Sequence, residues 1–145
     1  MLPKKAQTKI TLFNRFERSD GSCALLKTLF DRCSWQENYG ISTSNRQQDS
    51  AEYAEGSTEI IIPFSVLPKK YLSPKDFARL PFEEKENYFT LASGDKIVKG
   101  HIEEDYSRPV ELEKALGSDV VRTIVNVAVN DFGSRSMQHY GVEAN

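Results

Sequence analysis

The feature that most constrains this chain is an alternating segment near its C-terminus. β-Branched residues occupy every second position there: Val121, Thr123, Val125, Val127 and Val129. A period of two residues is typical of a β-strand with one buried face. Residues 137–142 follow a break at Gly133, and we expect them to fold back as the partner strand. The sequence therefore predicts a C-terminal hairpin that forms part of the core.

Several earlier segments also have the composition of strands. They are Lys9–Phe16, Cys23–Gln36, Thr58–Phe64, and a predicted hairpin of Tyr88–Leu91 with Lys96–Ile102. Cys23–Gln36 also fits a helical stripe, but the turn residues on both sides favour a strand. Residues 40–45 are its expected antiparallel neighbour.

Two short helices are predicted from their end signals. Ser73 and Pro74 are suited to cap and begin a helix over residues 74–80. A second helix over residues 109–116 begins with proline and is followed by Gly117. The charged run 83–86 is interpreted as a solvated surface. The sum is a mainly β fold, a small antiparallel β-barrel or sandwich with one or two short helices.

A chain of 145 residues suits one domain. We expect a flexible N-terminal arm over residues 1–8 and a single β-rich domain over residues 9–145, with a mobile polar loop near residues 44–57. The formal net charge of −2 gives no overall attraction for nucleic acid or an anionic membrane. No segment has the roughly 20 apolar residues of a membrane span, and no signal-peptide run follows Met1, so we expect synthesis in a cytoplasm.

The residue pattern assembles no catalytic, cofactor or metal site, and we expect a protein without enzymatic activity. Cys23 and Cys33 are too far apart for a close-paired zinc motif, and we interpret both as reduced, partly buried strand residues. His101 and His139 fall in predicted strands, and we interpret both as structural. No glycine-rich phosphate-binding motif is present in the sequence. An enzyme would require one histidine to meet a carboxylate in a deep pocket.

Three motifs resemble those of a family of small uncharacterised proteins encoded in the structural gene clusters of tailed phages and prophages. They are TLFNR at Thr11–Arg15, GDKIVKG at Gly94–Gly100, and NDFGS at Asn130–Ser134 followed by His139 and Tyr140. The resemblance covers most of the chain in the same order, but Phe132 and Tyr140 stand where arginine and tryptophan are common. It implies a non-enzymatic minor virion protein of the neck, a head-closure or head-tail connector subunit.

This role implies that copies of the protein assemble into a ring at the head-tail interface of the virion. The protein would be synthesised in the cytoplasm of a bacterial host, and its partners would be the portal or connector and the tail proteins of the phage. It requires no cofactor or membrane and allows non-specific contact with packaged DNA. Candidate assembly contacts lie in the polar loop and the N-terminal arm: Arg46, Gln47, Gln48, Asp49, Tyr53, Lys4 and Lys5. Two alternatives are a tail-completion protein of the same particle and a small β-barrel module that binds nucleic acid through a basic and aromatic strand face.

Overall fold

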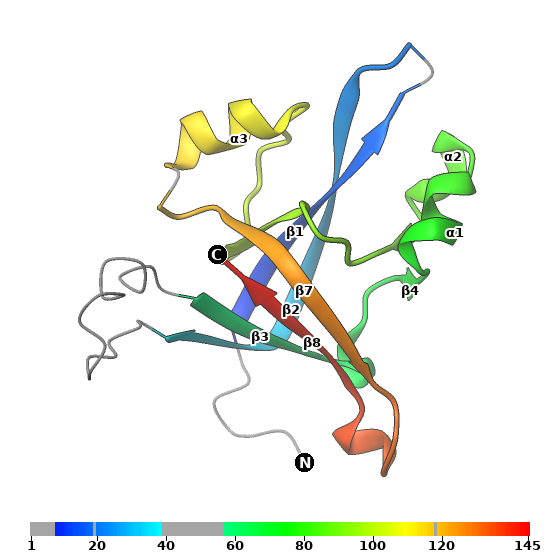
Figure 1. The fold of residues 1–145 in the computed structure, drawn as a ribbon, viewed down its shortest axis with the longest axis vertical. Coiled ribbons are helices and arrows are strands. Elements are labelled where there is room, and N and C mark those ends of the chain that lie inside the picture. The colour runs from blue at the N-terminus through cyan, green and yellow to red at the C-terminus, as the bar shows by residue number, and fades with distance from the viewer. Residues whose placement is uncertain (1–7, 19, 39–56, 118) are drawn as a thin grey trace, which may run out of the picture.

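The computed structural model of the chain describes residues 8–18, 20–38, 57–117 and 119–145. Its centre is a barrel-like antiparallel sheet of six strands (Figure 1). They are β1 (Thr8–Glu17), β2 (Cys23–Asn38), β3 (Ser57–Pro63), β6 (Lys96–Lys99), β7 (Arg122–Asn130) and β8 (His139–Ala144). The strands pair in the order β1-β2-β3-β8-β7-β6, and β6 pairs again with β1. The fold class predicted from the sequence, mainly β with a few short helices, is confirmed.

The pairing between β6 and β7 is the shortest in the barrel-like sheet. β6 and β7 pair only at Lys96 with Thr123 and at Ile97 with Arg122, whereas β1 and β2 pair along most of their length. Beyond Ile124, the pairing partner of β7 among the described residues is β8 alone. The barrel wall is therefore incomplete beside the C-terminal half of β7.

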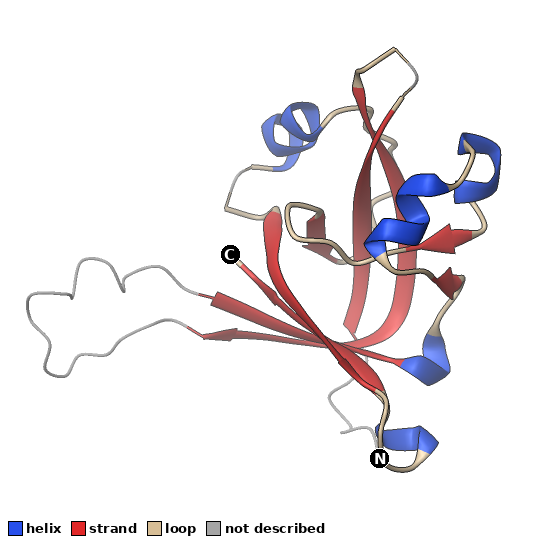
Figure 2. Ribbon diagram, turned by 45° about the vertical axis from the view of Figure 1, so that its right-hand side comes forward, coloured by secondary structure: helices blue, strands red, loops and turns tan. Residues whose placement is uncertain are grey.

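β1 is buried on both faces because it lies between two apolar clusters. Ile10 and Leu12 are fully buried in the barrel interior, where they share a cluster with Phe30 of β2. Phe13 belongs to a second cluster, together with Leu112 of α3 (Pro109–Leu116). Figure 2 shows α3 on one side of the β1–β2 hairpin and the pair of α1 (Pro74–Arg79) and α2 (Phe82–Lys85) on the other. The helices thus flank the strands at the end of the barrel from which this hairpin projects.

The C-terminal hairpin of β7 and β8 is confirmed, but the predicted single buried face of β7 is wrong. Ile124 is fully buried, and the register between β7 and β8 then shifts before Asn126. Val125 lies at the shift and is exposed, Val127 beyond it packs against the core, and Val129 near the end of the strand is exposed. A β-bulge adds one residue to one strand, so Ile124 before the shift and Val127 after it both face the core although their separation is odd.

Both predicted helices are confirmed. α1 spans Pro74–Arg79, and the Ser73 Oγ accepts a 3.3 Å hydrogen bond from the backbone N–H of Asp76. α3 ends before Gly117, whose φ of 100° is a conformation that favours glycine. These two helices were predictable because their end signals are local.

The interpretation of residues 83–86 as a wholly solvated run is wrong at Lys85. A further short helix, α2 (Phe82–Lys85), turns this residue towards α1. The Lys85 Nζ donates hydrogen bonds of 2.6 Å to the Phe77 carbonyl and 2.8 Å to the Leu80 carbonyl. Lys85 is therefore buried, because its ammonium group satisfies carbonyl groups at the C-terminal end of α1.

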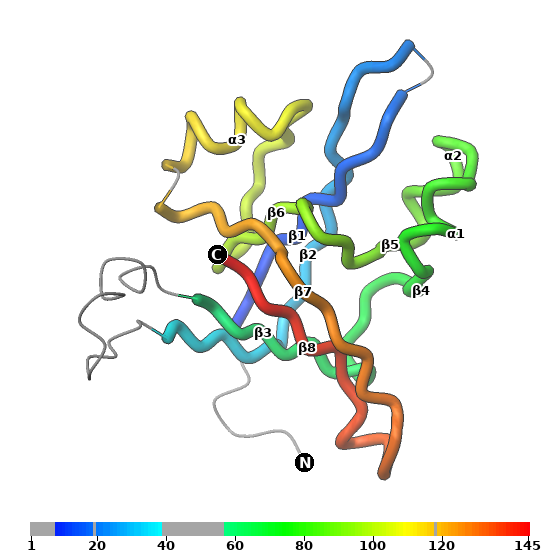
Figure 3. The backbone as a smooth tube through the Cα atoms, viewed as in Figure 1, coloured from blue at the N-terminus to red at the C-terminus, as the bar shows by residue number. Residues whose placement is uncertain are grey.

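The predicted hairpin of Tyr88–Leu91 with Lys96–Ile102 is also wrong. β5 (Tyr88–Phe89) pairs in parallel with β4 (Lys70–Tyr71), and β6 pairs antiparallel with β1 and β7 (Figure 3). The turn at Gly94 forms, but buried hydrogen bonds hold the residue after it against β1. β6 consequently runs along β1 instead of back along β5.

The two cysteines differ in burial although both were expected to be partly buried. Both are free, but Cys23 at the start of β2 is exposed and Cys33 is buried in the core. The exposure of Cys23 follows from its place beside the tip of the β1–β2 hairpin. The expected neighbour strand at residues 40–45, the loop near residues 44–57 and residues 1–7 of the arm lie outside the described residues, apart from Ser57, which begins β3.

Candidate functional site

The predicted assembly contacts lie outside the described part of the chain: Lys4, Lys5, Arg46, Gln47, Gln48, Asp49 and Tyr53. Candidate functional groups in the described part of the chain are therefore sought elsewhere. They are the buried polar residues, the two histidines, the lysines beside β2, and the exposed apolar side chains.

A buried polar network joins β1 to the segment before β6. Asn14 is fully buried, and its Nδ2 donates hydrogen bonds of 2.6 Å to the Thr90 carbonyl and 2.7 Å to Asp95 Oδ2. The Asn14 Oδ1 accepts a 3.2 Å bond from the Thr90 N–H. Asp95 is also buried and accepts bonds from the backbone N–H groups of Arg15 (3.0 Å) and Ala92 (3.3 Å). The network fixes the backbone on both sides of the turn.

The carboxyl group of Asp95 is electrostatically unusual. Burial raises its pKa to about 6 from the ordinary 3.8, and the hydrogen bonds from Arg15 and Asn14 oppose that shift. A raised carboxyl pKa is common at active sites. Here, however, the hydrogen bonds of Asp95 go to backbone groups and to Asn14. We therefore interpret Asp95 as a structural residue that anchors the turn.

Two of the three motif segments meet at this network. In addition to the contacts of Asn14, the Thr11 Oγ1 donates a 2.7 Å bond to the Gly100 carbonyl and accepts a 2.9 Å bond from the Ile102 N–H. Residues of TLFNR thus bind residues in and beside GDKIVKG across the β1–β6 pair. These motifs build the barrel wall.

His139 belongs to the C-terminal hairpin. Its Nε2 lies 3.0 Å from the Asn130 Nδ2, and its Nδ1 lies 2.9 Å from the Met137 carbonyl oxygen. A neutral imidazole with its proton on Nδ1 satisfies both contacts. Asn130 and His139 are also paired across β7 and β8, so the third motif segment closes this hairpin.

His101 makes the contact that an enzyme hypothesis would require, but at the surface. Its Nε2 lies 2.9 Å from the Phe30 carbonyl oxygen and 3.2 Å from Asp31 Oδ1. The Asp31 side chain is 71% exposed. The pair therefore lacks the enclosed surroundings in which a histidine and a carboxylate act as a catalytic unit.

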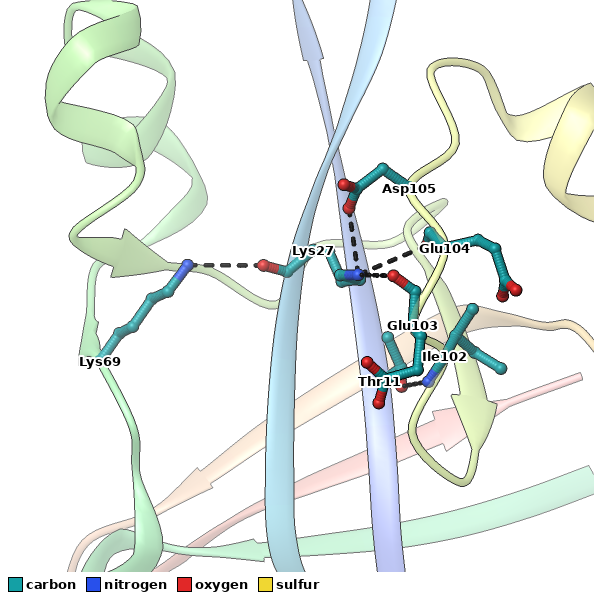
Figure 4. Close-up of polar contacts among 7 residues, drawn as sticks. All are labelled: Thr11, Lys27, Lys69, Ile102, Glu103, Glu104 and Asp105. Atoms are coloured by element: carbon teal, nitrogen blue, oxygen red, sulfur yellow. Dashed lines mark hydrogen bonds and ion pairs between the residues drawn. The ribbon is translucent and has the colours of Figure 1, made fainter.

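Lys27 of β2 ties the segment after β6 to the barrel (Figure 4). Its Nζ donates bonds to the carbonyls of Glu103 (2.8 Å) and Glu104 (3.4 Å) and lies 3.0 Å from Asp105 Oδ1. On the other side of β2, the Lys69 Nζ donates a 3.5 Å bond to the Lys27 carbonyl. The ammonium group of Lys27 is thus used within the chain.

A groove lies between the end of β1 and the helices α1 and α2. A cavity of about 380 Å³ is lined in part by Phe16, Leu80 and Phe82, and a second cavity of about 300 Å³ shares Phe16 and Lys85 with it. The ring centroids of Phe16 and Phe82 lie 5.4 Å apart. Burial lowers the pKa of Lys85. We call the surface of Phe16, Leu80, Phe82 and Lys85 the aromatic groove.

Exposed apolar side chains gather on β7 and on the turn after it. They are Val125 (41% exposed), Val129 (48%), Phe132 (75%) and Met137 (58%), four of the seven large hydrophobic side chains that are exposed in the described part of the chain. Single exposed apolar residues are normal, but these four fall close together in the sequence, which favours a contact role for this hairpin. We call these four side chains the apolar stripe.

Among the described residues, no three side chains of His, Cys, Asp or Glu gather as a metal site would require. The helices of the same ranges are too short or too polar to cross a bilayer.

One family model, described as a family of unknown function (DUF6751), matches residues 5–145. The chain belongs to this family. No curated protein and no solved structure matches it. Membership in DUF6751 assigns no activity or partner, so a functional argument rests on the residues of this DUF6751 protein itself.

The contacts predicted from the sequence lie in polar segments, and neither the apolar stripe nor the aromatic groove was predicted. The exposure of Phe132 could have been predicted from the sequence, because a large aromatic residue beside Gly133 in a turn has few local packing partners. Phe82 carries no comparable signal. Its exposure depends on how α2 docks beside β1, which residues far apart in the sequence decide.

Proposed function

We propose that this DUF6751 protein is a non-enzymatic structural subunit of a tailed-phage virion, which assembles as a head-closure or head-tail connector ring in the neck. The observation that carries the proposal is the apolar stripe on β7 and its turn. A ring subunit needs a different surface for each neighbour, since heterologous contacts close by rotation. The stripe and the aromatic groove are two such surfaces on different elements.

The virion part of the proposal is supported by the resemblance of three motif segments to proteins of phage structural gene clusters. Two of these segments build the barrel wall, and the third forms the β7–β8 hairpin. Such a division suits a ring subunit, in which a rigid barrel presents exposed hairpins to its neighbours. The protein would be made in the host cytoplasm and act at the head-tail interface. A tail-completion protein would use the same surfaces on a different ring.

One sheet face is poorly suited to the nucleic-acid alternative. Glu59 of β3 and Glu143 of β8 lie directly opposite each other, and both are exposed. Adjacent carboxylates repel each other and a phosphate backbone. We therefore prefer the connector role.

The proposal is tested by mixing the purified protein with the portal or connector ring of a phage that encodes it. Sedimentation velocity should show a complex of fixed stoichiometry. A variant with Val125→Thr, Val129→Thr and Phe132→Ser keeps residues suited to strand and turn and should lose binding. Val110→Ala, at an exposed valine of α3, is the matched control and should bind normally. Absence of a complex, together with binding to an oligonucleotide, would favour the nucleic-acid module instead.

A further inference from the structure

Lys69, which precedes β4, has a partly buried ammonium group that few polar atoms satisfy. Its Nζ donates one long hydrogen bond of 3.5 Å to the Lys27 carbonyl of β2 (Figure 4). Among the described residues, no carboxylate lies close enough to form an ion pair with it. An ammonium group can donate three hydrogen bonds, so Lys69 has donors left for water or for a bound group.

The other lysines of the described chain lie in different surroundings. Lys27 and Lys96 form ion pairs with carboxylates, and Lys85 is buried and bonded to two carbonyl groups. The remaining lysines are exposed to solvent: Lys9, Lys70, Lys75, Lys99 and Lys114. Of the lysines that the structure describes, Lys69 is therefore the one that is both shielded from solvent and unpaired.

Lys69 lines a cavity of about 330 Å³ beside β2. Arg18 and Lys27 add two cationic side chains to the lining, and Glu86 and Asp105 add two carboxylates. Asp105 lies 3.0 Å from the Lys27 Nζ, so these two charges largely balance each other. Arg18 is exposed and forms no side-chain ion pair within the described ranges. The cavity therefore presents the amine of Lys69 and a guanidinium group that can contact an anion.

The surroundings of Lys69 favour its neutral amine. Burial lowers the pKa of its ammonium group from the ordinary 10.5, and the negative charge of Glu86 opposes that shift. The other titratable groups around the cavity are Arg18, Lys27, Asp105 and Tyr106. A larger fraction of Lys69 than of an exposed lysine is thus neutral, and the neutral amine is the nucleophilic form. Because the cavity is open, a small electrophile can reach this amine.

We propose that Lys69 is a covalent modification site whose amine accepts an acyl group from small acyl phosphates. The neutral Nζ attacks the carbonyl carbon and forms an N–C bond. The C–O bond to phosphate breaks, phosphate leaves with that electron pair, and the proton lost from nitrogen passes to solvent. The Arg18 guanidinium group contacts the phosphate of the incoming reagent. The reaction needs neither a ring nor a partner protein, so it is independent of the connector role.

The product also suits this position. Acylation converts the ammonium group into a neutral amide, which removes the cost of keeping a charge partly buried. The amide N–H can still donate a hydrogen bond to the Lys27 carbonyl, as the Lys69 Nζ does now. The apolar side chains of Leu25 and Leu26 also line the cavity, and they can contact the acyl group.

The test is to treat the intact native chain with acetyl phosphate and to map the modified lysines by peptide mass spectrometry. Lys69 should be acetylated roughly threefold faster, or more, than the exposed Lys75 and Lys114. This ratio should shrink as the pH approaches 10.5, because the exposed lysines then lose their protons as well. Equal initial rates at the three lysines, or a ratio that does not change with pH, would overturn the proposal.

A substitution at Arg18 tests the class of reagent. Arg18→Gln should slow acetylation of Lys69 by acetyl phosphate about twofold or more, because the phosphate loses a cationic contact. It should leave unchanged the rate with the uncharged N-hydroxysuccinimide ester of acetic acid. Arg79→Gln, at an exposed arginine of α1, is the matched control and should change neither rate. If Arg18→Gln has no effect with acetyl phosphate, acyl phosphates are not the reagent class and the proposal fails.

A substitution at Glu86 tests the electrostatic part. The negative charge of Glu86 favours the ammonium form of Lys69. Glu86→Gln should therefore speed the reaction of Lys69 with the uncharged ester and leave Lys75 and Lys114 unaffected. Glu86 is exposed, so the variant should fold like the native chain. A slower reaction at Lys69 in this variant would contradict the assignment of its neutral amine as the reacting group.

Discussion

Replacing Asn14 by alanine should be among the most damaging single substitutions in this protein. The side chain is fully buried and makes three hydrogen bonds, two to the backbone of Thr90 and one to the carboxyl group of Asp95. These partners lie 76 and 81 positions further along the chain. Asn14→Ala therefore removes the link between β1 and the segment that leads into β6.

The magnitude follows from the groups left behind. A buried donor or acceptor that loses its partner costs about 1–3 kcal/mol. The Thr90 N–H and carbonyl groups both lose a partner, while Asp95 keeps its bonds to two backbone N–H groups. We therefore expect the free energy of unfolding to fall by about 3–5 kcal/mol. For a small domain this is a large fraction of a total of about 5–15 kcal/mol.

Urea denaturation followed by the fluorescence of Trp35, the single tryptophan, provides the assay. Trp35 packs against the main core cluster and reports its loss. The midpoint should fall while the slope with urea stays constant. Asn87→Ala is the control: Asn87 is exposed, and its side chain makes no hydrogen bond in the described part of the chain, so the change should stay within about 0.5 kcal/mol. If Asn14→Ala lowers the free energy of unfolding by less than about 1 kcal/mol, the conclusion that this network contributes strongly to stability is refuted.

Three further predictions concern buried groups. The folded-state pKa of Asp95, about 6, exceeds the ordinary 3.8, so the stability contributed by its neutral form is complete below about pH 4 and is lost as the pH rises through 6. Across that window, the free energy of unfolding of the native protein should fall by roughly 3 kcal/mol relative to that of the Asp95→Asn variant. If the two free energies of unfolding instead change with pH in parallel, the prediction is contradicted. Burial raises the pKa of Cys33 to about 12, so iodoacetamide should modify Cys23 alone in the native protein, as mass spectrometry can check. Lys85→Met removes two bonds to carbonyl groups and should cost about 1–2 kcal/mol in urea titrations; an unchanged midpoint would show that solvent replaces those bonds.

Much of the local structure was predictable from the sequence. Ser73 with Pro74 begins α1, and Gly117 ends α3, because capping depends on neighbouring residues. The strands at the start of the chain and the β7–β8 hairpin were also predictable, since alternation and a turn residue suffice.

The sequence by itself determined a mainly β domain, the places of two helices and the C-terminal hairpin, because these depend on period and on local end signals. Tertiary structure alone decided that β6 pairs with β1, that Lys85 is buried and that Val125 and Val129 are exposed. The physical reason is that burial depends on what covers a residue. Asn14 and Asp95 meet across 81 positions, and the bulge in β7 is defined only against β8. An alternating pattern predicts that a strand has two faces but does not reveal which of them another element will cover.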